Sequence, residues 1–399
     1  MSSLQMAPPQ RCRGMRDLLP ADMRAFRRVE DAFRAATARW GYEEIRTPTI
    51  ENYGLFTVAG ALTPQMLSRV YTFLDWDGWS GERVVLRPDS TIPVARAAAQ
   101  GGIEFPARLF YVQNVFRFSD SDDREDWQLG IEYLGAPSPV GEIEIAAVAC
   151  ETLDSLGLEP EVRIAHIGIA RAVIEALDPG EGDGAGLSAG VASQGLTALR
   201  PAAARHDGVS TFLDVALQRG GVPLLDNLEA LATGLPGAAA ALRELRSIGA
   251  ALSGAGRTVV VDLNLPHDFE YYTGAVFEFA GGGHSWGRGG RYRPAGPGTP
   301  ESACGIGLDA AQLAGHISAS TRPPLVVSIV PAVESDMARA VSVARALHRS
   351  GIAAALAADA GNAPMAVRVS ADGLVARTPA GEHKLAALDD VVGLLLQFK

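Results

Sequence analysis

The chain has 399 residues and a formal net charge of −11, and 47% of its residues are hydrophobic. This length is sufficient for two or three domains with substantial cores. The acidic balance argues against a nucleic-acid-binding protein, which usually carries a basic face. The first residues, MSSLQMAPPQRC, lack the apolar core of a signal peptide, and no apolar run reaches the length of a membrane span. We therefore expect a soluble, cytoplasmic protein with no membrane partner.

The cysteines and histidines suggest neither a disulfide framework nor a metal site. Cys12, Cys150 and Cys304 are isolated and odd in number. The seven histidines are scattered, and none is spaced for metal binding with a cysteine or an acid. We therefore predict a chain from a reducing compartment, without a metal or a cofactor.

The N-terminal part of the chain alternates helical and strand patterns. Apolar residues recur at helical spacing in 21–40, which predicts a long amphipathic helix. Residues 41–51 are typical of a strand, and Pro48 within them indicates a sheet edge or a subunit boundary. Residues 83–100 predict a strand, a turn and an N-capped helix.

The middle of the chain predicts a sheet that is interrupted by helices. Residues 108–118 and 127–136 indicate an antiparallel pair of strands, 141–158 a helix and 161–168 another strand. From 169 to about 256 the chain is Ala/Leu-rich and helical. We interpret this segment as a helical insertion into an antiparallel-sheet core.

Strand patterns resume after the insertion. Residues 257–265 and 264–277 are both typical of strands. Tyr271 and Tyr272 are adjacent in the second, so we expect them to point to opposite faces, with at most one in any given pocket. We interpret the glycine-rich segment 281–292 as a tight turn between strands, because no helix follows it to make a dinucleotide-binding loop.

The C-terminal part predicts a separate small domain. Residues 320–324, STRPP, are typical of a linker, and strand, helix and strand patterns follow. We therefore expect a core domain of residues 1–320, with the helical insertion at about 169–256, and an α/β domain of residues 323–399. The fold class is α+β.

Four collinear stretches together carry a resemblance that none would carry alone. They are RGMRDLLP (13–20) with the helix after it, LRPDSTIPVAR (86–96), FYVQNVFRF (110–118) with WQLGIE (127–132), and FEYYTGAVFE (269–278) with GGRY (289–292) and CGIGLD (304–309). They resemble the class II aminoacyl-tRNA synthetases, and within that class the histidyl-tRNA synthetase family. The resemblance covers most of residues 11–312. It implies a six- or seven-stranded antiparallel sheet flanked by helices, a helical insertion and a small anticodon-binding α/β domain.

The resemblance implies that the amino-acid half of the family's site is retained. Carboxylates would hold an α-ammonium group, an acid and a tyrosine hydroxyl would bracket an imidazole, and an arginine could face a carboxylate or a phosphate. Taken singly, the acid and the second tyrosine are as readily explained as satisfied sheet residues. Their joint occurrence at family positions favours a histidine-binding pocket. Its residues would be Asp89, Thr91, Arg117, Gln128, Glu132, Tyr271 and Tyr272.

The nucleotide half of the site departs from the family. His267 and Ala310 stand where the family has arginines, and Ser119 stands where it has the glutamate that serves adenine. The connection 119–126, SDSDDRED, has five acids and one arginine. Adenylate formation needs cations on the phosphates, so an acidic loop would repel ATP and tRNA. For the loop alone, a solvated turn is the alternative.

The C-terminal domain also departs from the family. Residues 323–399 are shorter than the family's anticodon domain, and 355–370 stand where a basic, tRNA-contacting helix would be expected. We interpret this segment as a remnant of that helix.

A synthetase-like chain that keeps the amino-acid pocket but not catalysis resembles the regulatory subunits of ATP phosphoribosyltransferase. This resemblance implies a non-enzymatic chain that supports the short-form ATP phosphoribosyltransferase catalytic subunit in the first step of histidine biosynthesis. It further implies L-histidine as effector, a homodimer within a hetero-oligomer, and no tRNA. The alternatives are a divergent or active histidyl-tRNA synthetase and an RNA-binding or tRNA-modifying paralogue; the charge balance weakens the last of these.

Overall fold

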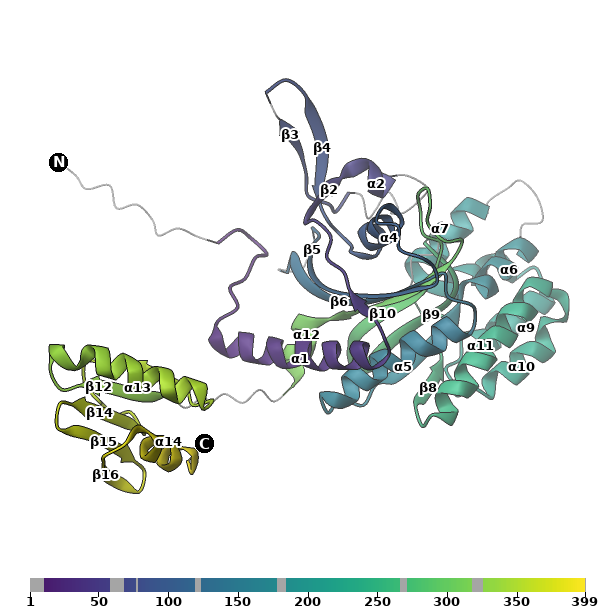
Figure 1. The fold of residues 1–399 in the computed structure, drawn as a ribbon. Coiled ribbons are helices and arrows are strands. Elements are labelled where there is room, and N and C mark those ends of the chain that lie inside the picture. Colours follow the sequence, from purple (N-terminus) through teal and green to yellow (C-terminus); the bar gives the residue numbers. More distant parts are fainter. Residues whose placement is uncertain are drawn as a thin grey trace, which may run out of the picture. The chain divides into compact units, whose positions relative to one another are not determined.

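The chain folds into two compact units, residues 1–319 and 320–399, each with its own hydrophobic core (Figure 1). The computed structural model describes residues 11–57, 68–76, 78–118, 123–177, 184–265, 271–317 and 326–398. The predicted linker, 320–324, lies outside these described residues.

The first unit is built on an eight-stranded sheet with the order β1-β5-β6-β11-β10-β9-β7-β8. The strands are β1 (Glu43–Glu44), β5 (Ala107–Phe116), β6 (Glu125–Leu134), β7 (Glu161–His166), β8 (Thr258–Val261), β9 (Tyr272–Gly281), β10 (His284–Tyr292) and β11 (Ala303–Asp309). All inner pairs are antiparallel, which includes the predicted β5–β6 pair. Each outer strand is parallel to its neighbour, β1 to β5 and β8 to β7, so the sheet is mixed rather than wholly antiparallel. The predicted α+β fold is confirmed.

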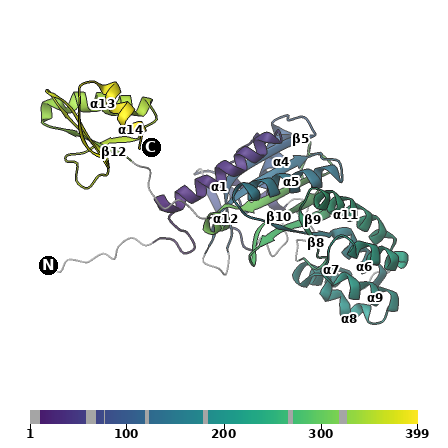
Figure 2. The same cartoon turned by 90° about the horizontal axis from the view of Figure 1, so that it is seen from below.

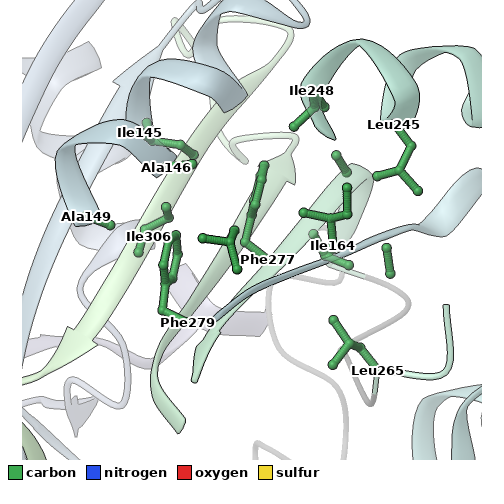
Figure 3. Close-up of a cluster of buried hydrophobic side chains, with 14 of the residues drawn as sticks. Ile145, Ala146, Ala149, Ile164, Leu245, Ile248, Leu265, Phe277, Phe279 and Ile306 are labelled. Carbon is green, nitrogen blue, oxygen red and sulfur yellow. The ribbon is translucent and has the colours of Figure 1, made fainter. Parts of the chain in front are cut away.

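Helices α1 (Pro20–Arg39), α5 (Val140–Ser155) and α12 (Ala310–His316) cover one face of this sheet, and Figure 2 shows α1 and α5 lying over it. The predicted helix 21–40 is confirmed as α1, which buries Phe26, Val29 and Phe33 at helical spacing. Figure 3 shows side chains of α5 facing those of Phe279 and Ile306 in the sheet. We call this side of the sheet the core face.

The segment predicted to be helical lies between β7 and β8. It contains α6 (Ile167–Leu177), α7 (Gly184–Gln194), η2 (Gly195–Leu199), α8 (Arg200–Ala203), α9 (Asp207–Ala216), α10 (Leu224–Leu231), η3 (Ala232–Gly234) and α11 (Pro236–Gly254). Because β7 and β8 are parallel, their connection must cross over the sheet, and these helices form that crossover. Leu245 and Ile248 of α11 pack with Ile164 of β7 (Figure 3).

A separate three-stranded sheet has the order β2-β4-β3, with β2 (Ile50–Asn52), β3 (Thr72–Trp76) and β4 (Gly81–Leu86). Helix α2 (Tyr53–Thr57) packs against β2 and β4, and α4 (Thr91–Gln100), the helix that the sequence predicted after the turn, packs against β6. The predicted side-chain cap is absent, because Ser90 at the N-cap of α4 makes no side-chain cap hydrogen bond.

The prediction of one strand over 41–51 is wrong, because the segment divides into β1 and β2, which belong to different sheets. The cause lies between them: the guanidinium group of Arg87 donates to the carbonyl oxygens of Thr47 and Pro48, at 2.8 and 3.0 Å. These carbonyls are therefore unavailable to a continuous ladder, and Pro48 has no N–H to donate.

The interpretation of 281–292 as a turn is also wrong beyond its first residues. Gly282 and Gly283 have φ of 58° and 84° and form the turn, while residues 284–292 are the central strand β10. The glycines within β10 serve close packing. A Cβ atom on Gly289 would lie 2.1 Å from the carbonyl oxygen of Gly305 on the neighbouring strand.

The second unit has a five-stranded sheet with the order β13-β12-β14-β15-β16. Its elements are β12 (Val327–Pro331), η4 (Glu334–Asp336), α13 (Met337–Arg349), β13 (Ala354–Leu356), β14 (Ala366–Ser370), β15 (Gly373–Thr378), β16 (Gly381–Leu385) and α14 (Leu388–Leu396). The predicted strand–helix–strand order is confirmed in β12, α13 and β13. Residues 355–370 contain no helix; they hold the end of β13 and all of β14.

The close packing at Gly289 generates a stability prediction. We expect Gly289→Ala to lower the free energy of unfolding by about 2–3 kcal/mol, because the backbone of β11 must move to admit the methyl group. Gly315→Ala in α12 is the matched control, since a Cβ atom there meets nothing within 4 Å, and alanine favours a helix by up to about 1 kcal/mol. Urea unfolding measures both. Equal stability of the two variants would contradict this account of β10.

Candidate ligand-binding site

A cavity of about 530 Å³ lies on the face of the eight-stranded sheet opposite the core face. Paired residues of neighbouring strands share a face, so the register places Gln128, Gly307, Arg288 and Glu278 together on this side. Gly307 makes room for its neighbour, because a Cβ atom there would lie 2.4 Å from Nε2 of Gln128. The sheet thus presents polar side chains from several strands to one cavity.

Five of the seven residues predicted for the site line this cavity. They are Asp89, Arg117, Gln128, Tyr271 and Tyr272. The expectation that only one of the two tyrosines would enter a pocket is wrong. β9 begins at Tyr272, so Tyr271 precedes the strand and is not bound by its alternation. The two rings meet edge to face at 5.1 Å, and Tyr271 stacks on Tyr292 at 5.2 Å.

Two cavity-lining side chains have buried polar atoms without a hydrogen-bond partner among the described residues. These atoms are the hydroxyl oxygen of Tyr271 and Oε1 of Gln128. A buried, unpaired polar group costs about 1–3 kcal/mol. Such groups are expected where a ligand supplies the missing partner.

Asp89 and Arg117 form a loosely paired couple at the cavity wall. Nη2 of Arg117 lies 3.7 Å from the carboxylate of Asp89. Nε of Arg117 donates to the carbonyl oxygen of Pro88, which holds the guanidinium group at the turn before α4. The other carboxylate oxygen of Asp89, Oδ1, accepts a hydrogen bond from the backbone N–H of Thr91 at 2.8 Å.

Thr91 and Glu132, the other two predicted residues, are not among the residues that line the cavity. Glu132 is buried behind it, where it accepts from the hydroxyls of Tyr292 at 2.7 Å and Tyr111 at 3.3 Å. Thr91 lies 3.5 Å from the Tyr111 hydroxyl. Burial raises the pKa of Glu132 to about 8, although the hydroxyls around it oppose this shift. A carboxyl group with a pKa of about 8 is mainly protonated at neutral pH.

Sequence reasoning missed Tyr292 and Tyr111 as partners of Glu132. The motif GGRY that ends in Tyr292 was recognised, but its strand was taken for a turn. With β10 assigned as a strand, the period of two would have put Tyr292 on the cavity face. The position of Tyr111 could have been predicted in the same way, because it lies on the cavity face of β5, opposite Gly130.

Glu278 and Asp309, two acids that line the cavity, already have hydrogen-bond partners. Glu278 accepts from Arg288 at 2.7 Å and from Arg163 at 2.9 Å. Burial opposes ionisation of Glu278, but the hydrogen bonds from Arg288 and other neighbours hold its pKa below the ordinary value. Asp309 accepts from the N–H groups of Ala311 and Gln312 and so caps α12.

The positions at which the sequence was expected to depart from the synthetases are only partly described. Ala310 is fully buried in the first turn of α12. His267 and residues 119–122, the first half of the acidic connection, lie outside the described residues. Asp126 of that connection does line the cavity, and its pKa is raised by burial and by the nearby carboxylate of Asp309.

Neither a metal centre nor a membrane span is found in the described ranges. They contain no group of three or more His, Cys, Asp or Glu side chains placed to hold a metal ion. No helix among them is both long and apolar enough to cross a bilayer.

Comparison of the sequence with known proteins identifies its relatives. The family model described as histidyl-tRNA synthetase matches residues 14–313. An ATP phosphoribosyltransferase regulatory subunit of Dehalococcoides mccartyi is 37% identical over 358 residues, which is 87% of each chain. One from Moorella thermoacetica is 31% identical over 88% of this chain and 92% of its own. A histidine–tRNA ligase of Methanosphaerula palustris is 31% identical over 87% and 85%.

Solved structures give the same relationship. An ATP phosphoribosyltransferase regulatory subunit/histidyl-tRNA synthetase from Bacillus halodurans superimposes with a TM-score of 0.78 at 26% identity, over 92% of this chain and 99% of the other. The histidyl-tRNA synthetase of Nostoc sp. shares the fold with a TM-score of 0.77 at 19% identity, over 99% and 100%. The chain belongs to the histidyl-tRNA synthetase family, in its branch of ATP phosphoribosyltransferase regulatory subunits.

Proposed function

We propose that this chain is a non-catalytic subunit that partners a short-form ATP phosphoribosyltransferase catalytic chain and makes the first step of histidine biosynthesis responsive to L-histidine. Family membership supports the partner, because the relatives at 31–37% identity over most of their length carry the name of regulatory subunit. We propose that L-histidine binds in the cavity because two buried polar atoms there, on Tyr271 and Gln128, lack hydrogen-bond partners among the described residues.

The charges at the cavity wall suit a free amino acid. An amino acid carries an ammonium and a carboxylate group on adjacent atoms. Asp89 and Arg117 are 3.7 Å apart, which is a weak ion pair. A zwitterion inserted between them would pair its ammonium group with Asp89 and its carboxylate with Arg117, so that both charges gain closer partners.

The remaining polar groups suit an imidazole side chain. A neutral imidazole has one nitrogen that donates and one that accepts. The unpaired Oε1 of Gln128 can only accept, and the unpaired hydroxyl of Tyr271 can donate. Glu132 lies behind Tyr292 and accepts a hydrogen bond from its hydroxyl, so it positions the aromatic wall of the pocket rather than contacting the ligand.

The charged residues around the cavity support the absence of synthetase chemistry. Stabilising a transferring phosphate needs cations that are free to approach it. Arg288 is paired with Glu278, and the family's arginine position at 310 is a buried alanine. Asp126, Glu278 and Asp309 add negative charge to the same cavity.

The alternative function is that of a divergent or active histidyl-tRNA synthetase. The 31% identity to the Methanosphaerula palustris ligase favours it. Adenylate formation separates the two: histidine-dependent exchange of pyrophosphate into ATP, well above a control without protein, would establish the alternative. We expect none.

Removing the Tyr271 hydroxyl should weaken histidine binding without cost to the fold. Tyr271→Phe deletes a hydroxyl that has no partner among the described residues, so we expect the histidine dissociation constant to rise about tenfold. The thermal midpoint of the ligand-free chain should stay the same or rise slightly. Calorimetric titration and thermal unfolding measure these two effects. Tyr292→Phe is the control, because its hydroxyl donates to Glu132 and its loss should lower the midpoint. Unchanged affinity in Tyr271→Phe would place the ligand elsewhere.

From the raised pKa of Glu132 we predict that the stability of the fold depends on pH. Its pKa is about 8 in the folded chain and ordinarily 4.5, so the folded state binds the proton more tightly. The free energy of unfolding should therefore fall as pH rises from about 5 to about 8 and level off above that. Glu132→Gln keeps the shape and cannot ionise, so its stability relative to wild type should increase over the same window. Urea unfolding at several pH values tests this. Parallel profiles of the two proteins would show that Glu132 does not titrate in this window.

The proposed partnership is tested in the complex. We expect the chain to co-elute with a short-form ATP phosphoribosyltransferase and to confer inhibition by histidine on it. In complexes made with Tyr271→Phe, co-elution should persist while the inhibition curve shifts to about tenfold higher histidine. Failure to co-elute would end the partner proposal. Intact inhibition in the variant complex would move the regulatory histidine to another site.

A further inference from the structure

Two histidines that the proposed function does not use lie against each other in the first unit. His284 is the first residue of β10, and His316 is the last residue of α12. Both are exposed, and their ring centres are 4.2 Å apart at an interplanar angle of 66°. Because the two residues are far apart in the sequence, no spacing pattern could have predicted that they meet.

The hydrogen bond of His316 fixes the position of its ring proton. Nδ1 of His316 lies 2.7 Å from the carbonyl oxygen of Gln312. A carbonyl oxygen can only accept, so Nδ1 carries the proton and Nε2 has a free lone pair. Histidines that bind metals commonly donate their other ring N–H to a carbonyl oxygen in this way, which sets the tautomer and orients the ring. His316 therefore has the arrangement of a metal ligand.

The distance between the two rings fits two ligands at a right angle. With a metal–nitrogen bond of about 2.0–2.1 Å, the centre of an imidazole ring lies about 3.2 Å from the ion. Two such rings have centres about 4.5 Å apart when the angle at the metal is about 90°, and about 5.2 Å apart when it is tetrahedral. The observed 4.2 Å is close to the first value. Right angles are typical of tetragonal Cu(II) and Ni(II) sites, whereas structural Zn²⁺ sites are tetrahedral.

The backbone that carries the two histidines is held in place, so little order must be gained on binding. His284 pairs with Gly281 across the turn. The ring of Trp286, which is buried, lies edge to face with His316 at 6.2 Å. Helix α12 is capped by Asp309, whose side chain accepts from two backbone N–H groups. Only the outer torsion of each imidazole has to adjust for both nitrogens to face one ion, and that torsion is broad in energy.

We propose that His284 and His316 form a binding site for a divalent transition-metal ion of the Cu(II) or Ni(II) type, with the two imidazole nitrogens as adjacent equatorial ligands. Imidazole suits these ions, and Cu(II) is bound most tightly in the first-row series. The described residues hold no group of three or more such ligands, so this is a site with two protein ligands, and water supplies the others. It is an exception to the expectation, from the sequence, of a chain without a metal.

The test uses the full chain with Cys12→Ser as the parent protein, because Cys12 is exposed and Cu(II) oxidises accessible thiols. Calorimetric titrations with Ni(II) and with Cu(II) should each show one tight site per chain. His284→Asn and His316→Asn should each raise the dissociation constant by at least about tenfold, because a single imidazole lacks the gain from chelation. His206→Asn is the matched control, since it removes an exposed histidine at the start of α9, and it should bind like the parent.

Two further measurements separate a shared site from scattered binding to single histidines. The EPR spectrum of bound Cu(II) should show coupling to two imidazole nitrogens in the parent and to no more than one in either variant. Ni(II) should raise the thermal midpoint of the parent by a few degrees and leave the midpoints of both variants unchanged. Both histidines are exposed, so without metal the variants should unfold at the same temperature as the parent.

A dissociation constant that is unchanged in either variant would overturn the inference, because the ion would then have at most one of the two histidines as a ligand. The absence of a tight site in the parent would overturn it as well. In both cases the rings make only an edge-to-face packing contact. The titrations contain neither L-histidine nor a catalytic subunit, so their failure would leave the proposed function in place.

Discussion

A buried ion pair fixes the register on which the rest of the first unit depends. Arg291 of β10 reaches through the core face to Glu142 of α5, with two hydrogen bonds to its carboxylate, and also donates to the carbonyl oxygen of Ala136 at 2.9 Å. Glu142 is fully buried, so losing either partner would leave an uncompensated charge at a cost of about 3–5 kcal/mol. A slip of β10 by one residue would turn Arg291 into the cavity and Tyr292 into the core. The pair therefore specifies which half of the sheet side chains can meet a ligand.

That register explains how one sheet can hold a well-packed core and an incompletely satisfied cavity on opposite faces. On the core face, Ile306 and Phe279 pack under α5 without polar atoms (Figure 3). On the cavity face, Glu132 must be buried and protonated, and the hydroxyl of Tyr271 and Oε1 of Gln128 have no partner among the described residues. Each of these features lowers stability, so the core face and the ion pair carry the stability that the cavity face lacks.

Local patterns in the sequence were sufficient for elements whose neighbours lie nearby in the chain. Helix α1 and the β5–β6 pair were predictable because spacing and a short connection determine them. β10 was not, because glycine signals a turn locally and its packing role appears only when Gly289 meets Gly305 across the sheet. Likewise, Pro48 signalled a sheet edge, but the break between β1 and β2 depends on Arg87, 39 residues further on. The candidate site was predictable through family motifs; that Glu132 lies behind Tyr292, out of the cavity, follows only from tertiary contacts.

Under the proposed function, the cavity keeps the groups that bind an amino acid and lacks those for catalysis. This is possible because binding and catalysis make different demands on a site. Ground-state affinity for an amino acid needs groups that match its charges and its side chain, and Asp89, Arg117, Gln128 and Tyr271 line one cavity with these chemistries. Catalysis needs interactions that strengthen only in the transition state, here cations placed for a phosphate. A cation that is lost at position 310, or neutralised as Arg288 is by Glu278, removes the second property and leaves the first unchanged. A ligand that binds without reacting dwells in the pocket and can bias a partner through its differential affinity for two states, which is what a feedback regulator requires.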